Sequence, residues 1–354
     1  MNEPLRALLL TLLLLLGGLA ILLVAALVVV RATSELLERR AARRRDEIRG
    51  LILSALLGEP EESASALAAL HVREGRAWRQ VEQQAFAILP KIKGDTRDAL
   101  VSLLKNAGAA ERAYENTRAR SAVRRSRGAY QLGALGDRAA VPTLLELLPT
   151  DHFLVRRTVV RALGQVRDPE AVPRLLDAVT ADPALVRDVI AALQRIGPEA
   201  TPYLRKDLAF LLVAEHSGRR GALAATVLGL HGDIASVPVL VEAVARAHQS
   251  SLRAAAAEAL GEIGVPAAVQ VLTEALGGDL PEVQVKAAEA LGKVGATSAL
   301  PALVSALGCG AHEVDRAVAE ALVKLGGPGM QALEEHVSPY AAEALALRRM
   351  MAAV

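Results

Sequence analysis

The stretch ALGKVGA, Ala290 to Ala296, is one of seven related segments that decide the fold of this chain. The other six, in chain order, are QLGALGD (131–137), ALGQVRD (162–168), ALQRIGP (192–198), VLGLHGD (227–233), ALGEIGV (259–265) and ALVKLGG (321–327). Their sixth residues are separated by 31, 30, 35, 32, 31 and 31 positions. A period near 31 residues, with two apolar-periodic stretches per period, is typical of helix hairpins stacked into a solenoid.

Each repeat is predicted to consist of a first helix, a turn and a second helix. The first helix ends at the sixth residue of the segment, where the left-handed conformation favours glycine. These residues are Gly136, Arg167, Gly197, Gly232, Gly264, Gly295 and Gly326. Proline recurs in the first turn of the second helix, where its missing N–H costs nothing. These prolines are Pro142, Pro173, Pro202, Pro238 and Pro301. Because glycine recurs at six of these seven turns as a hairpin device, it does not indicate a phosphate-binding loop.

The third repeat departs from the pattern. The first three residues of each segment are called here the ALG motif, and Gln194 stands where the other early repeats have the glycine of this motif. In addition, KDLAFLLVAEHSG (206–218) adds residues before the next repeat. We therefore expect a local irregularity around residues 194–219, which would bend the solenoid or form a distinct contact surface.

These repeats resemble the HEAT-repeat superfamily, in particular the short bacterial HEAT-like repeats first associated with phycobilin lyases. The resemblance covers residues 122–354 and implies an all-α solenoid of about seven repeats. It implies a protein-binding scaffold more often than an enzyme. It also implies a ladder of ion pairs between neighbouring repeats, here joining Arg156, Arg187 and Arg253 to Asp137, Asp168 and Asp233.

Residues 7–30, in the predicted N-terminal domain 1–30, carry no charge, and Thr11 is their one polar side chain. As a helix this segment would be about 36 Å long, enough to cross a hydrocarbon core of ~30 Å. It is too long for the apolar part of a cleaved signal peptide, so we expect a single transmembrane anchor. Arg6 precedes it and seven arginines follow it between residues 31 and 49, which predicts an N-terminus outside and a cytoplasmic C-terminal body at the cell membrane.

Residues 31–121 are predicted to form a juxtamembrane helical stem of degenerate hairpins. A helix from Ser34 is expected to stop at Gly58-Glu59-Pro60, and further helices are expected at 61–72, 76–89 and 96–106, with Asp95 as an N-cap. Trp78, Phe86 and Ile88 are spaced for one apolar face.

The net charge of +2 is the sum of two opposed halves. Residues 31–127 carry 20 Lys and Arg against 13 Asp and Glu, and residues 128–354 carry 20 against 25. Candidate contacts with anionic lipid or an acidic partner are the arginines of two clusters, although a solvated face explains them equally well. These are Arg39, Arg40, Arg43, Arg44, Arg45, Arg118, Arg120, Arg124, Arg125 and Arg127. The acidic solenoid makes nucleic acid an unlikely ligand, because tracking a phosphate backbone needs a continuous basic surface.

The sequence contains no catalytic motif that we recognise. With 52% hydrophobic but only 2% aromatic residues, it lacks the aromatic side chains with which HEAT-like glycosylases would hold a damaged base. A single His-Glu pair, His312-Glu313, cannot build the two-metal site of the HEAT-like di-iron hydroxylases. The single Cys, Cys309, lies three residues before His312, which is a weak indication of a nucleophile and base. We therefore expect that the protein is not an enzyme and that it binds no cofactor and no metal.

The sequence thus predicts a membrane-tethered scaffold or adaptor that recruits a protein partner. The resemblance suggests a membrane enzyme such as a glycosyltransferase, or a signalling component, as that partner. The alternatives are a lyase-like enzyme or ligand-binding subunit and, with less support, a nucleic-acid-binding protein. Periodicity places the candidate partner contacts on the second helices, at Glu146, Arg174, Asp177, Glu242 and Arg246.

Overall fold

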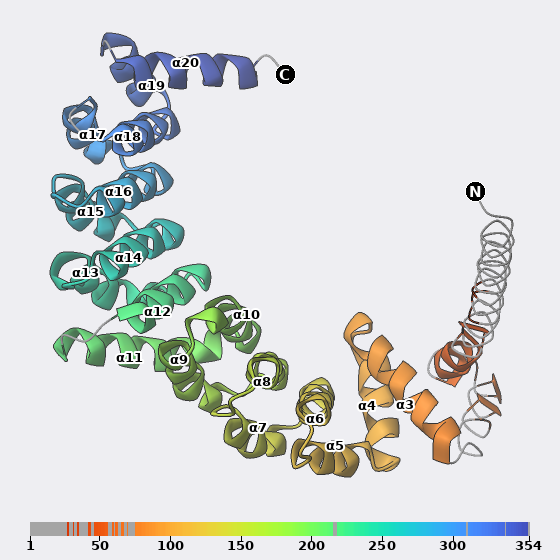
Figure 1. Cartoon of the computed structure of the whole chain (residues 1–354). Coiled ribbons are helices and arrows are strands. Elements are labelled where there is room, and N and C mark those ends of the chain that lie inside the picture. The colour runs from red at the N-terminus through yellow and green to blue at the C-terminus, as the bar shows by residue number, and fades with distance from the viewer. Residues whose placement is uncertain are drawn as a thin grey trace, which may run out of the picture. The chain divides into compact units, whose positions relative to one another are not determined.

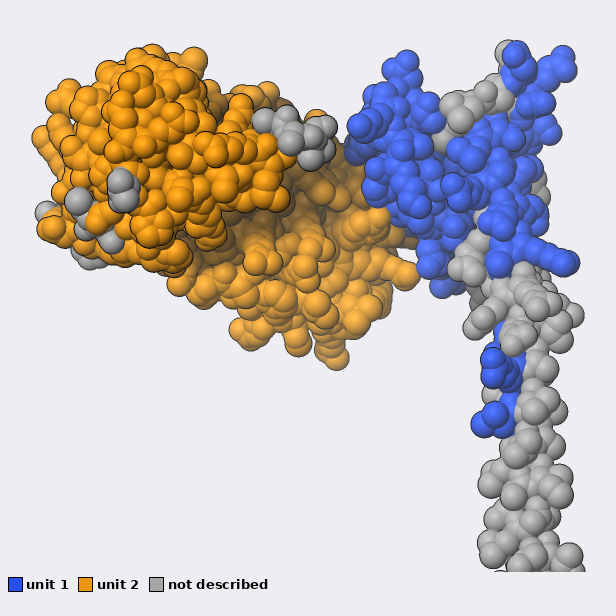
Figure 2. Space-filling model, turned by 90° about the horizontal axis from the view of Figure 1, so that it is seen from above, with its two compact units in different colours: residues 1–109 blue, residues 110–354 orange. Residues whose placement is uncertain are grey.

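The computed structural model describes residues 75–214, 218–308, 311–336 and 338–352. Before residue 75 it describes residues 27, 31, 34, 42–43, 46–55, 59, 61–62, 65–66 and 69. All regular structure among these residues is helical, which confirms the predicted all-α class. The chain divides into two compact units, called here the N-terminal unit (residues 1–109) and the C-terminal unit (residues 110–354; Figure 2).

The predicted membrane segment, residues 7–30, lies outside the described residues except for Leu27. Among the residues that are described, none of the helices has both the length and the apolar character needed to span a bilayer. The anchor therefore stays a prediction from the sequence.

The N-terminal unit contains α3 (Gly75–Ile88), the short 3₁₀ helix η1 (Leu89–Lys91) and α4 (Asp95–Asn106). These bounds agree with the two helices predicted at 76–89 and 96–106. Phe86 and Ile88 are buried as expected, and Trp78 is half-buried. The predicted N-cap was wrong by one residue. Gly94, with φ of 63°, occupies that position, and Asp95 is already in the first turn of α4.

The C-terminal unit is built from two rows of helices that run the length of a curve (Figure 1). The row on the concave side, called here the inner row, comprises α6 (Ala122–Leu135), α8 (Phe153–Val166), α10 (Val186–Ile196), α12 (Gly218–Leu230), α14 (Ser250–Ile263), α16 (Pro281–Val294) and α18 (His312–Lys324). The outer row comprises α5 (Ala109–Thr117), α7 (Val141–Leu147), α9 (Val172–Ala181), α11 (Thr201–Val213), α13 (Val237–Arg246), α15 (Val269–Leu276), α17 (Leu300–Ala306) and α19 (Gly327–Glu335). The last helix is α20 (Pro339–Ala352).

The predicted hairpin turns are confirmed. Gly136, Gly264 and Gly295 adopt the left-handed conformation at the ends of their helices. Arg167 does the same with φ of 60°, as the one residue other than glycine with positive φ among those described. Gly197 and Gly326 combine a positive φ with ψ near −160° and −139°, a region open essentially to glycine alone.

A short 3₁₀ helix that the sequence analysis did not predict separates most turns from the second helix. These are η2 (Arg138–Ala140), η3 (Pro169–Ala171), η5 (Pro198–Ala200), η6 (Ile234–Ser236), η7 (Pro266–Ala268) and η8 (Thr297–Ala299); η4 (Pro183–Leu185) instead precedes α10. The five recurring prolines occupy the first turn of the outer-row helices, as predicted.

The third residue of the ALG motif explains how neighbouring inner-row helices pack. A Cβ added to Gly261 of α14 would lie 2.7 Å from the Cα of Ala290 in α16. The same relation, at 2.5 to 2.9 Å, joins Gly133 to Ala162, Gly164 to Ala192, Gly229 to Ala259 and Gly292 to Ala321. Alanine of one motif thus lies directly on glycine of the preceding motif, which lets two backbones approach to a distance that any side chain would prevent.

One joint between inner-row helices lacks this contact, at the place where the sequence predicted an irregularity. On α10 the glycine is replaced by Gln194, and on α12 the alanine is replaced by Val227. Gln194 is exposed, whereas the glycines at the matching positions of α8 and α14 are buried. The outer helix between them, α11, has 13 residues against 10 in α9 and α13, and it exposes Phe210 and Val213.

Candidate functional site

Three of the five predicted partner contacts lie together on the outer row. Glu146 of α7 and Arg174 and Asp177 of α9 line a groove of about 850 Å³ between these two helices, called here the outer groove. Glu242 and Arg246 lie elsewhere, on α13, where Arg246 donates a hydrogen bond to Glu242 at 3.4 Å. All five side chains are on exposed residues of the second helices, where the periodicity placed them.

Half of the charged side chains that line the outer groove are already compensated by ion pairs. Arg156 donates to Asp182 at 2.6 Å and to the carbonyl of Thr150 at 2.7 Å. The bond from Arg156 is the main cause that lowers the pKa of Asp182, and a bond from the Ala184 N–H adds to it. Asp177 pairs with Arg220 of α12. These contacts connect neighbouring repeats, and they leave Glu146, Asp151 and Arg174 without an ion pair among the described residues.

The predicted Arg–Asp ladder was wrong in its pairing. Asp137 and Asp168 cap the 3₁₀ helices that follow them, accepting from the N–H groups two residues on at 3.1 and 3.0 Å. An aspartate just after a helix end reaches its own backbone before it reaches a distant guanidinium.

Of the remaining members of the ladder, Arg187 is exposed and forms no ion pair within the described residues, and the other three have other partners. Asp233 accepts from Arg205 at 2.5 Å, and Arg253 donates to the carbonyl of Val244 at 2.8 Å. Arg156, as described above, pairs with Asp182 and not with the aspartate of a hairpin turn.

A second groove lies on the inner row and crosses three successive helices. It has a volume of about 680 Å³ and is called here the inner groove. Its lining includes Arg127 and Tyr130 of α6, Arg161 and Gln165 of α8, and Arg195 of α10. Asp188 of α10 is the acidic residue of the lining.

The inner groove keeps an excess of positive charge. Asp188 accepts from Arg157 at 3.0 Å and from Arg161 at 2.7 Å, so one carboxylate faces two guanidinium groups. Arg127 and Arg195 are exposed, and neither forms an ion pair within the described part of the chain. Burial raises the pKa of Tyr130, which keeps its phenol protonated and able to donate a hydrogen bond at neutral pH.

The predicted basic run 118–127 divides between structure and surface. Arg125 donates to the carbonyls of Ala119 and Arg120 at 3.2 and 3.0 Å, which closes the loop between α5 and α6. Arg124 donates to Asn116 at 3.3 Å. Arg118 and Arg120 are exposed, and Arg127 is the one member that lines the inner groove. Of the juxtamembrane arginines, Arg43 is exposed in a helix, and Arg39, Arg40, Arg44 and Arg45 lie outside the described residues.

The sequence analysis missed the other residues of the inner groove. Aligning the repeats on the ALG glycine places Tyr130 and Arg161 three residues before it and Gln165 and Arg195 one residue after it, counting Gln194 as its equivalent. This register marks one exposed stripe of the inner row. It could have been found by aligning the first helices as closely as the turns.

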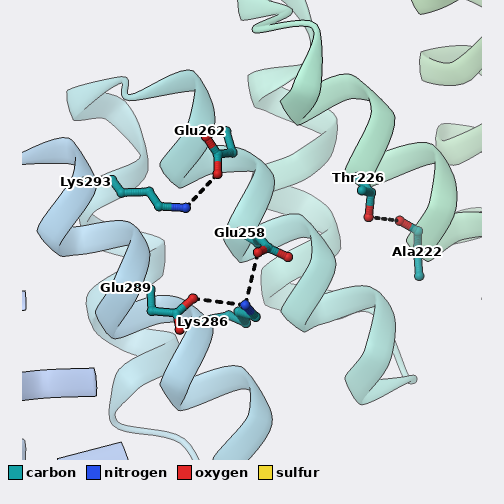
Figure 3. A network of polar contacts seen from close by, with 7 residues as sticks. All are labelled: Ala222, Thr226, Glu258, Glu262, Lys286, Glu289 and Lys293. Carbon is teal, nitrogen blue, oxygen red and sulfur yellow. Dashed lines mark hydrogen bonds and ion pairs between the residues drawn. The ribbon is translucent and has the colours of Figure 1, made fainter. Parts of the chain in front are cut away.

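Further along the inner row the same stripe carries balanced charges. Lys286 donates to Glu258 and Glu289 at 3.0 Å each, and Lys293 donates to Glu262 at 2.6 Å (Figure 3). Desolvation acts to lower the pKa of Lys286, but its bonds to the two glutamates outweigh this and raise it. The stripe therefore changes from basic around α6 to α10 to mutually paired around α14 and α16.

The Cys309–His312 arrangement considered from the sequence stays untested. Cys309 lies outside the described residues, and the ring nitrogen Nδ1 of His312 is 3.0 Å from the hydroxyl of Tyr340. Within the described part of the chain no cluster of His, Cys, Asp and Glu side chains could hold a metal ion.

Several solved structures are similar to this chain, but the similarity is distant. The complex of CpcE and CpcF of phycocyanin lyase from Nostoc is 23% identical, covering 67% of this chain and 92% of that chain with a TM-score of 0.33. Human deoxyhypusine hydroxylase is 19% identical, covering 80% and 98% with a TM-score of 0.31. Kap121p is 11% identical, covering 87% and 45% with a TM-score of 0.36.

The family is established by a direct match to the sequence. No curated protein matches this chain. The family model for HEAT repeats matches residues 115–194, 215–281 and 275–350, which is more than half of the chain. These matches include six of the seven segments on which the repeat was first defined, and the first three residues of the segment 192–198 in the irregular third repeat. The chain therefore belongs to the HEAT-repeat family.

Proposed function

We propose that this protein is a non-catalytic scaffold that binds a protein partner along its repeats and holds it at the cytoplasmic face of a membrane. The observation that carries the proposal is the pair of grooves, about 680 and 850 Å³, formed where successive repeats meet. A solenoid gains its stability from contacts between neighbouring repeats, so its exposed rows remain available for binding.

The tether is supported by the sequence. The uncharged segment 7–30 and the arginines that follow it are what an anchor with a cytoplasmic C-terminal body requires. Resistance of the full-length chain to alkaline extraction from membranes, and activity of a C-terminal reporter on the cytoplasmic side, would agree with the proposal. Reporter activity on the opposite side would refute the orientation.

Site-specific crosslinking in cells tests the scaffold. A photoreactive amino acid replaces Ala191, an exposed residue of the inner groove, or Ala245, an exposed residue of α13 that lines neither groove. We expect one discrete adduct from position 191 and none from position 245. In the reciprocal experiment, with an affinity tag on the captured protein, that protein should in turn retrieve this chain. Adducts of equal yield from both positions, or with abundant proteins only, would contradict a scaffold that binds at this face.

A further inference from the structure

The inner groove collects arginines from three successive repeats on one exposed stripe. Arg127, Arg161 and Arg195 line it, against the single carboxylate of Asp188. No comparable excess exists in the outer groove, where the carboxylates of Glu146, Asp151, Asp177 and Asp182 outnumber two arginines. The two grooves therefore differ in sign, although they are of similar size.

Arg161 is held in place by the protein before any ligand arrives. Its Nε donates to Asp188 at 2.7 Å, and among the described residues its two terminal nitrogens have no hydrogen-bond acceptor. A guanidinium fixed through Nε presents the remaining N–H groups as a planar fork that suits a carboxylate. Because Asp188 also binds Arg157, it orients this part of the groove without neutralising it.

The basic stripe is short. Packed helices lie about 8–10 Å apart, so three helices span about 20 Å, or roughly six residues of extended chain. Beyond this the stripe is no longer basic: at the position of Arg161, three residues before the ALG glycine or its equivalent, α14, α16 and α18 carry Glu258, Glu289 and Glu320. Glu258 and Glu289 already pair with Lys286, so these repeats offer no excess of positive charge. A long polyanion would meet these glutamates, whereas a short acidic segment would not.

The lining also offers apolar surface between the arginines. Ala191 is exposed in the groove and Tyr130 is half-buried, whereas Ala162 and Ala192 are buried at its floor. Such a surface suits an apolar side chain that lies between acidic ones.

We infer that the inner groove binds a short acidic segment of a partner protein, about six residues long, whose carboxylates pair with Arg127, Arg161 and Arg195. The inference rests on the proposed function, because it names the chemistry of the partner at the scaffold's surface. It adds that recognition is by charge at the repeats of α6, α8 and α10 and that the C-terminal repeats take no part in it.

The test uses the full-length chain in a neutral detergent and a fluorescein-labelled octapeptide of six glutamates and two leucines. Fluorescence anisotropy at low salt measures its affinity for the wild type and for Arg161→Glu, Arg195→Glu and the double variant. Each single change should weaken binding about tenfold, as expected for losing a charge-assisted hydrogen bond, and the double variant about a hundredfold. The peptide with glutamine in place of glutamate should not bind.

Arg174→Glu is the matched control, since it reverses an exposed arginine of the outer groove. It should change the affinity by less than about twofold, because it lies outside the inner groove. Arg161→Lys keeps the charge but removes the fork, and it should fall between the wild type and Arg161→Glu. Arg195→Glu removes no contact made within the described residues, so a folding defect would not account for its loss of binding.

Two results of the binding experiment would overturn the inference, and a third comes from crosslinking. One is an equal loss of affinity in Arg174→Glu, which would show unspecific attraction. The other is an octanucleotide that binds as tightly as the peptide with the same dependence on Arg161 and Arg195. If the double variant still gives the crosslinked partner from position 191, the inference fails and the scaffold stands. If the peptide binds as expected but no partner is captured, the proposed function fails instead.

Discussion

Two joints between neighbouring helices of the inner row differ in how closely the helices pack, and the residues of the ALG motif explain the difference. Between α14 and α16, Gly261 lies against Ala290, and both are buried. Between α10 and α12 the corresponding residues are Gln194 and Val227, and Gln194 is exposed. Within one repeat pattern, the smallest pair of side chains makes a closed joint, and the larger pair leaves an open one. The basic inner groove ends at the open joint, which separates it from the repeats with paired charges.

The largest effect on stability is expected from Gly261→Ala, which adds one methyl group at the closed joint. In an exposed helix Gly→Ala would stabilise by about 1 kcal/mol, but in Gly261→Ala the new Cβ would lie 2.7 Å from the Cα of Ala290. Because backbone cannot move aside cheaply, we expect a net loss of about 2 kcal/mol.

Hydrogen exchange should localise that loss to α14 and α16 and leave α6 to α10 unchanged, since solenoid repeats contact only their neighbours. Gln194→Ala at the open joint is the control, and it should be neutral or slightly stabilising. Equal destabilisation by both variants would show that the two joints do not differ in the way described.

A second glycine of the same hairpin, Gly264, allows the energetic effect of backbone conformation to be measured apart from that of close packing. A Cβ on Gly264 would meet nothing within 4 Å, but its φ is 72°. Gly264→Ala should therefore cost about 1 kcal/mol through backbone strain alone. Arg167→Gly, which relieves the same conformation at the end of α8, should gain about 0.5–1 kcal/mol. Thermal unfolding of both variants measures the pair, and changes of the same sign would contradict this explanation.

The stability of α8 and α10, next to the open joint, should depend on pH through Asp182. Its pKa is lowered from the ordinary 3.8, so the stability it contributes is fully present above that value and is lost as the pH falls through the lower folded pKa. Asp182→Asn should flatten the loss of stability of α8 and α10 in acid and leave α14 and α16 unaffected. Acid titrations followed by hydrogen exchange check this. An unchanged acid response of α8 and α10 would show that the pair with Arg156 does not stabilise them.

The smallest effect is expected on the outer row. Arg246 and Glu242 form a pair whose side chains are 79% and 50% exposed, so solvent screens their attraction. Arg246→Ala should change the free energy of unfolding by less than about 0.5 kcal/mol. A chemical denaturation curve that shifts by more would mean that α13 contributes to a contact beyond this pair.

Much of the fold could be predicted because it follows from local features. Positive φ at Gly136 and Gly264 and the prolines that open the second helices are properties of single residues and their immediate neighbours. The sequence therefore indicated the hairpins, their period and the irregular third repeat. The 3₁₀ helices η2 and η3 escaped prediction because their capping aspartates, Asp137 and Asp168, were assigned to distant arginines.

The site was predicted less well than the fold. Periodicity correctly placed Glu146, Arg174 and Asp177 on exposed outer helices, but it could not show that Asp177 is already paired with Arg220 of α12. Ion pairs such as Arg161 with Asp188 join residues 27 positions apart, and their geometry depends on how closely two helices approach.

The sequence by itself determined the all-α class, the repeat, the turns and the uncharged segment 7–30, because each of these depends on residue type and spacing along the chain. Tertiary structure alone decided which face carries unbalanced charge and where the array opens. The physical reason is that stacking sets the distance between helices. At a closed Gly–Ala contact the glycine has no room for a side chain of its own. The distance between helices then decides which charges of neighbouring repeats reach one another and which remain exposed to a partner.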